Sequence, residues 1–269
     1  MAIFSIFAYK NGFMRVFRSI ALIINYKTFI ITFLAVAGTW LCDYYNIEAE
    51  FPLTLVAIAI VFPVVFSIDS AYKRRERALG LLGDFKAHAM SIYHAVKDWT
   101  PNDAAYKADV KAHLLDVYSS IREFFVAEHD KENSAEKNIY IKMSELSALL
   151  QKLRDYDLQA GEMSRINQYS SKILTSVENL KVFWHYRTPI TLRAYSKVFI
   201  YTFPLIYAPY FVSVAEKYSH GLEYVMPVIF SFILVSLDNI QGHLENPFDQ
   251  IGEDDIKFDV EEFGDLLDL

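Results

Sequence analysis

The residues whose spacing could carry function are apolar: Ile58, Phe62 and Phe66 recur every four residues in an uncharged run. Side chains at this spacing share one face of a helix. A helix that crosses lipid needs no separate bulky stripe, so the pattern is compatible with two roles. It could line a pore that strips water from an ion, or it could face lipid or a packed core.

Two charged residues continue the same stripe. At about 100° per residue, Asp69 and Lys73 fall within roughly 60° of Ile58 on a helical wheel. A ring of carboxylates favours cations, and a ring of ammonium groups favours anions. The stripe therefore predicts an apolar neck that opens into a charged vestibule, with Asp69 and Lys73 competing over selectivity.

Composition narrows the class of protein. Of 269 residues, 53% are hydrophobic and 22% are charged, and the net charge of −7 argues against a nucleic-acid surface. Cys42 is the single cysteine, so an intrachain disulfide is excluded. The sequence has no Gly-rich phosphate loop or HExxH motif, and its seven histidines are scattered, which predicts no enzyme, no cofactor and no histidine metal site.

The stripe can line a pore only in a membrane protein, and four segments of the chain are candidate membrane spans. They lie within 19–42, 51–68, 198–215 and 222–237, and each is shorter than the roughly 20 apolar residues of a lone span. Basic residues flank the first three at the ends that would share one side of the membrane, whereas the short connections are acidic or mixed. By the positive-inside rule, both termini and the long middle region are cytoplasmic.

The middle region reads as helical, with apolar residues at three-four spacing and no strand alternation. The second span is expected to run into it without a break, and Thr100-Pro101-Asn102-Asp103 marks a stop and a new start. Further helices are predicted over 104–127 and 135–157. The fold class is therefore all-α: a polytopic membrane protein with four spans and a cytosolic helical bundle around a central pore. The predicted domains are 1–68, 69–195, 196–241 and 242–269.

The acidic C-terminal tail allows two interpretations. It is either a solvated tail or a weak calcium site, whose candidate ligands are Asp249, Glu253, Asp254 and Asp255. Calcium needs six to eight oxygens, and Ile251-Gly252 and Ile256-Lys257 interrupt the cluster. The interrupted run favours the solvated tail.

Two segments resemble the bestrophin family of ion channels. One is Phe66-Ser-Ile-Asp-Ser-Ala-Tyr72 with the arginines that follow it. The better match is Leu237-Asp-Asn-Ile-Gln-Gly-His-Leu-Glu-Asn-Pro-Phe248 with Asp254-Asp255. The order of spans and helical block is also similar over nearly the whole chain, and the form resembled is a short one without a long C-terminal extension.

The resemblance implies a homopentamer in a lipid bilayer, with an axial pore that passes monovalent ions, chloride and other anions foremost. It places the neck at Ile58, Phe62 and Phe66. A second, cytosolic constriction is a further possibility, at Met163 or Ile166, although bundle packing is the simpler interpretation of both residues.

The chain departs from the family pattern below the neck. Ser67-Ile68-Asp69 replaces the usual Arg-Thr-Asn, and Arg74-Arg75 replaces a Trp pair. Asp69 favours cations, whereas the basic cluster from Lys73 to Arg77 favours anions. A cation-selective homologue and a non-channel membrane scaffold therefore remain as alternatives.

Overall fold

The computed structural model describes residues 24–50, 53–100, 102–126, 132–187, 189–218, 221–250 and 255–268; the side chains of 53–57, 132 and 215–218 are outside the description. All of its regular elements in these ranges are helices, as predicted. The chain packs as two compact units. Unit 1 comprises 1–73 and 188–245, and unit 2 comprises 74–187 and 246–269. This division follows packing, whereas the predicted domain boundaries refer to a membrane and stay a prediction.

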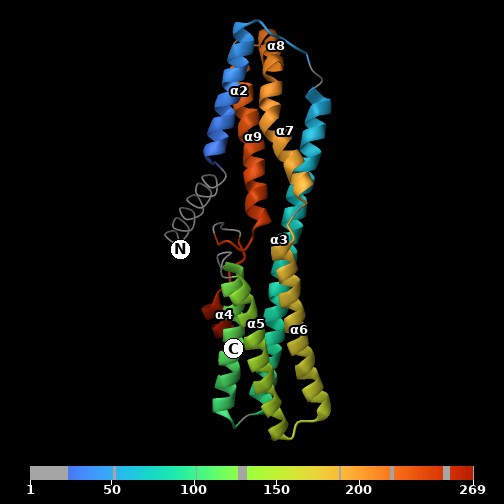
Figure 1. The fold of residues 1–269 in the computed structure, drawn as a ribbon, viewed down its shortest axis with the longest axis vertical. Coiled ribbons are helices and arrows are strands. Elements are labelled where there is room, and N and C mark those ends of the chain that lie inside the picture. Colours follow the sequence, from blue (N-terminus) through green and yellow to red (C-terminus); the bar gives the residue numbers. More distant parts are fainter. Residues whose placement is uncertain are drawn as a thin grey trace, which may run out of the picture. The chain divides into compact units, whose positions relative to one another are not determined.

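Helix α3 runs from Leu53 to Trp99 and contributes to both units (Figure 1). The prediction that the second apolar segment continues into the middle region without a break is therefore confirmed. Pro63 lies inside the helix, and its missing N–H does not end it. Helix α3 ends at Trp99, directly before the stop predicted at Thr100-Pro101-Asn102-Asp103, and α4 begins at Ala104. The Asp103 carboxylate caps α4, since it accepts a hydrogen bond from the Tyr106 N–H at 2.8 Å.

Unit 1 is built from the first part of α3 and four further helices. These are α2 (Tyr26–Tyr44), α7 (Ile190–Ile206), α8 (Ala208–Tyr218) and α9 (Leu222–Glu245), and α9 packs against α2, α7 and α8 (Figure 1). Asn25 begins α2 with a capping box that includes Thr28. The shared core consists of Ile60, Val64, Ile200, Phe203, Tyr207, Phe211, Leu234 and Val235.

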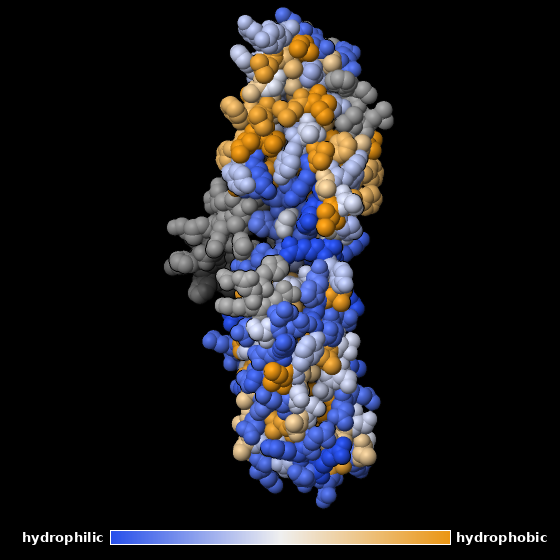
Figure 2. Space-filling model, in the orientation of Figure 1, coloured by the Kyte–Doolittle hydropathy of each residue, from blue (hydrophilic) through white to orange (hydrophobic). Residues whose placement is uncertain are grey.

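The apolar helices of unit 1 coincide with the described parts of the four predicted spans, with one break. Among the described helices, α9 alone is long and apolar enough to cross a membrane by itself, and α7 with Ala208–Val214 passes as a pair bent by 44°. The bend falls at Tyr207, between Pro204 and Pro209, so the predicted third span is a broken one. Figure 2 shows apolar side chains gathered on the surface over unit 1, while polar side chains dominate over unit 2.

Unit 2 is a helical bundle. It contains the second part of α3, α4 (Ala104–Val126), α5 (Glu132–Gln151), the 3-10 turn η2 (Lys152–Tyr156), α6 (Ala160–His185) and α10 (Val260–Asp268). The helix predicted over 104–127 is confirmed by α4, whereas the one predicted over 135–157 begins earlier and is an α-helix only to Gln151, after which the 3-10 turn follows. Lys181 ties α6 to α5, because its buried ammonium lies 2.6 Å from the Glu136 carboxylate and also contacts Tyr140. Burial opposes the charge of Lys181, but these hydrogen bonds prevail and raise its pKa.

The C-terminal tail does not extend freely into solvent as the favoured interpretation had it: its aromatic side chains pack into unit 2, while most of its described acids are exposed. Phe248, Phe258 and Phe263 are 1%, 4% and 0% exposed and belong to the core of unit 2. The Phe263 ring lies 4.8 Å from that of Tyr118 on α4, measured between centroids. Asp259, Glu261, Glu262, Asp265 and Asp268 are exposed, whereas Asp255 is buried. The acidic composition of the segment hid its buried aromatic side.

Candidate functional site

The first part of α3 has two opposite faces. Ile60, Val64 and Ser67 are at most 3% exposed, and the two aliphatic residues pack into the core of unit 1. On the other face, Ile58 and Phe66 are 48% and 59% exposed. The face with Ile60 and Val64 thus packs α3 against its own chain, whereas the predicted neck stripe on the opposite face remains exposed.

The exposed stripe is aromatic and wide. Phe62 is 56% exposed, and its ring lies 5.9 Å from that of Phe66, measured between centroids. Val61 and Val65 beside it are also about half exposed. A contiguous apolar surface of this kind is poorly hydrated. It can therefore contact lipid or a second chain, or line a dewetted pore.

The stripe ends in an ion pair. Lys73 Nζ donates to Asp69 Oδ2 at 2.7 Å, and their side chains are 72% and 47% exposed. The sequence treated these residues as two separate rings of opposite charge. In the structure they form an ion pair within one helix, so each partly neutralises the charge of the other.

The basic cluster that follows is largely engaged as well. Arg74 donates to the Phe183 carbonyl at 2.6 Å, and its guanidinium lies 6.0 Å from the centre of the Phe183 ring. Arg75 pairs with Glu76 at 2.7 Å. These contacts fix the arginines to the bundle and to a carboxylate, which reduces the field that they present to an ion.

Met163 and Ile166 lie in the core of unit 2. They are 7% and 0% exposed and belong to its buried apolar cluster. A side chain that is enclosed by its own chain cannot face an ion path. The cytosolic constriction is therefore not supported at these residues, and the bundle-packing interpretation fits their burial.

A set of buried polar residues lies at the end of α9 and was not predicted from the sequence. The Tyr201 hydroxyl donates to Asp238 Oδ2 at 2.6 Å, and Arg193 pairs with Glu245 at 2.8 Å. Asn25 Nδ2 donates to Asn239 Oδ1 at 2.7 Å, which ties α9 to the start of α2. The signal was present in the sequence, because Asp238, Asn239, Gln241 and Glu245 follow an apolar run at helical spacing. These residues connect helix ends.

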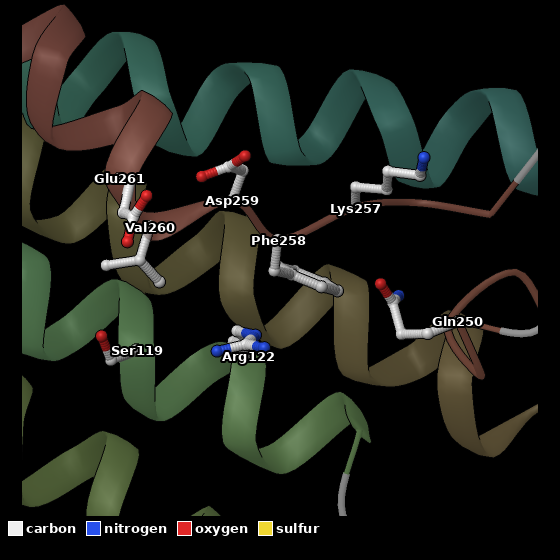
Figure 3. A pocket seen from close by; sticks show the side chains of 8 residues that line it. All are labelled: Ser119, Arg122, Gln250, Lys257, Phe258, Asp259, Val260 and Glu261. Carbon is white, nitrogen blue, oxygen red and sulfur yellow. The ribbon is translucent and has the colours of Figure 1, made fainter.

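The terminal segment forms a pocket with α4, shown in Figure 3. It measures about 540 Å³ and its charged wall is mixed, with Arg122 and Lys257 beside Asp259 and Glu261. Two cations in the wall disfavour a calcium ion. Of the calcium candidates, Asp249 accepts from Asn246 Nδ2 at 2.8 Å and Asp255 is 9% exposed, while Glu253 and Asp254 lie outside the described residues. Within the described ranges, no three acidic, histidine or cysteine side chains are grouped so as to hold a metal.

Comparison with known proteins finds likeness in structure alone. No family model and no curated protein matches the sequence. Solved structures of a bacterial bestrophin homologue from Klebsiella pneumoniae match well. One variant covers 90% of this chain and 94% of its own with 13% identity and a TM-score of 0.75. The structure phased on zinc covers 94% and 95% with 12% identity and a TM-score of 0.70. The chain therefore has the bestrophin fold.

Proposed function

We propose that this chain is one subunit of a bestrophin-like homopentameric channel in a lipid bilayer, which passes monovalent ions through an apolar neck. The observation that carries the proposal is the two-faced α3. One face packs into unit 1, and the opposite face leaves Ile58, Phe62 and Phe66 exposed in a single chain. Five such faces around an axis would enclose a dewetted constriction. The fold shared with bestrophin homologues supports this arrangement.

The proposed topology follows the sequence. The helices α2, the first part of α3, the bent pair α7–α8 and α9 are the four spans, and the basic flanks of the first three lie on the cytoplasmic side. Both termini and the helical block 69–195 are then cytoplasmic, and the chain performs no chemical step.

Chloride and other anions are the proposed cargo. An apolar neck favours ions that lose water readily, and from Asp69 to Arg77 four basic residues stand against two acidic ones. Cation selectivity is the second candidate, and one observation favours it: the Asp69 carboxylate is 47% exposed while its partner Lys73 neutralises part of the basic cluster.

The test is reconstitution of the purified chain into planar bilayers with a potassium chloride gradient. We expect the reversal potential to shift toward the chloride equilibrium potential. In detergent, the particles should have about five times the chain mass of 31.1 kDa. A reversal potential of the opposite sign identifies the cation-selective alternative. A monomer or dimer without current supports the membrane scaffold and refutes the channel.

A further inference from the structure

A small pocket opens between α2 and α7 within unit 1. It measures about 230 Å³ and is lined by Lys27, Ile30 and Ile31 of α2 and by Lys197 and Tyr201 of α7. On each helix these residues are three or four positions apart, so each helix turns one face toward the pocket. Its walls are apolar, and its charged groups are two ammonium groups from different helices.

In the described part of the chain, neither lysine has a carboxylate within ion-pair distance, and both side chains are partly buried. Arg193, one turn before Lys197, is different because Glu245 neutralises it at 2.8 Å. Tyr201 of the pocket wall donates its hydroxyl to the Asp238 carboxylate, which is itself 6% exposed. Two cations against one engaged acid leave a net positive pocket.

The two lysines also stand at the same membrane boundary. Lys27 is the second residue of α2 and precedes the apolar run 28–42, and Lys197 directly precedes the apolar segment 198–215. These boundaries were assigned from separate parts of the sequence, and the fold brings them to one pocket. A pocket with basic groups at the membrane surface and an apolar wall beside them has the layout of a phospholipid.

We propose that this pocket binds an anionic phospholipid of the cytoplasmic leaflet. Its phosphate lies between the Lys27 and Lys197 ammonium groups, and an acyl chain covers Ile30, which is 50% exposed. A free phosphate would satisfy the charges and leave the isoleucines uncovered, so the lipid is the occupant that fits both features. The inference rests on the membrane topology of the proposed function, and it does not require ion conduction.

The test is native mass spectrometry of the delipidated full-length protein, titrated with dioleoyl phosphatidylglycerol or with the phosphatidylcholine of the same chains. We expect tighter binding of phosphatidylglycerol. Each single Lys→Ala variant should weaken it about fivefold, and Lys27→Ala with Lys197→Ala about thirtyfold, which corresponds to about 2 kcal/mol. Lys27→Arg with Lys197→Arg should retain binding, because the charges are kept.

The control is Lys137→Ala with Lys152→Ala, which removes the same charge from unit 2 and should leave binding unchanged. Equal affinity for both lipids, or a double variant that binds like the parent, overturns the proposal. Displacement of the lipid by millimolar inorganic phosphate also overturns it, in favour of a free-anion site. Currents in phosphatidylcholine bilayers are measured separately. Conduction without lipid preference refutes this inference alone, and lipid preference without conduction refutes the channel alone.

Discussion

Lys73 and Asp69 form an ion pair of 2.7 Å on the exposed stripe of α3, one turn below the neck aromatics. An exposed pair of this spacing contributes about 0.3–0.5 kcal/mol to folding, so its loss should leave the helix intact. Its consequence is electrostatic, because each partner masks the other at the proposed ion path. In the proposed channel, removing one partner would unmask the charge of the other and change ion selectivity.

Asp69→Asn should raise the anion-to-cation permeability ratio, because it removes a carboxylate and frees the Lys73 ammonium. Lys73→Ala should lower the ratio, and the double variant should return near the parent. A change of about 1.4 kcal/mol in relative ion free energy gives a tenfold change in the ratio, so reversal potentials resolve even part of it. Glu123→Gln, an exposed carboxylate on α4, is the control. Unmoved reversal potentials in both single variants would place these side chains off the ion path.

The neck assignment predicts the effect of side-chain size. Replacing Ile58, Phe62 and Phe66 together by Ala should widen the constriction and raise single-channel conductance, because a wider and less apolar neck dewets less readily. The matched control replaces Phe29, Phe33 and Leu34 of α2 by Ala. These residues are also exposed and apolar, and their replacement should leave the conductance unchanged. A neck variant that assembles normally and conducts like the parent would contradict the pore assignment.

The terminal segment should bind calcium weakly. Arg122 and Lys257 stand in the wall of the adjoining pocket, and the acidic run is interrupted, so we expect a Kd no tighter than about 10⁻⁴ M by titration calorimetry. Micromolar affinity that disappears in Asp254→Ala with Asp255→Ala would refute this prediction.

Docking of the tail should stabilise unit 2. Phe263 is fully buried against Tyr118, and a Phe→Ala change at such a site costs about 3–5 kcal/mol. Phe263→Ala should therefore lower the thermal unfolding temperature of the full-length protein. Asp265→Ala, on the exposed side of the same helix, should leave it nearly unchanged. Equal unfolding temperatures for both variants would mean that the tail does not contribute to the core.

Asp103 should contribute a pH-dependent part of the stability. Its carboxylate accepts hydrogen bonds from the Tyr156 hydroxyl and then from the Tyr106 N–H, and these lower its pKa from 3.8. A lowered folded-state pKa gives stability that is present above the ordinary carboxyl range and is lost as the pH falls through the folded value. Asp103→Asn should thus lower the unfolding temperature at neutral pH, and its effect should diminish as the pH falls below the ordinary carboxyl range. Asp155→Asn is the control, and a pH-independent effect of Asp103→Asn would show that the charge is not involved.

Local pattern determined much of this protein. The spacing of Ile58, Phe62 and Phe66 matches the helix period of 3.6 residues and predicts a helix there. The stop predicted at Thr100 to Asp103 coincides with the end of α3 and the start of α4. These features depend on residues close in sequence, so composition and spacing suffice to predict them. The all-α class and the bestrophin resemblance followed from the same kind of signal.

Tertiary structure alone decided which surfaces are covered. Phe263 and Tyr118 are 145 positions apart in the chain, and no local pattern shows that the acidic segment turns its aromatic side onto α4. Likewise, spacing could not distinguish the buried Ile166 from the exposed Phe62, since both belong to regular apolar stripes. Periodicity states that a helix has an apolar face, but the partner of that face is set by long-range packing. The pocket that unites Lys27 with Lys197 arises in the same way.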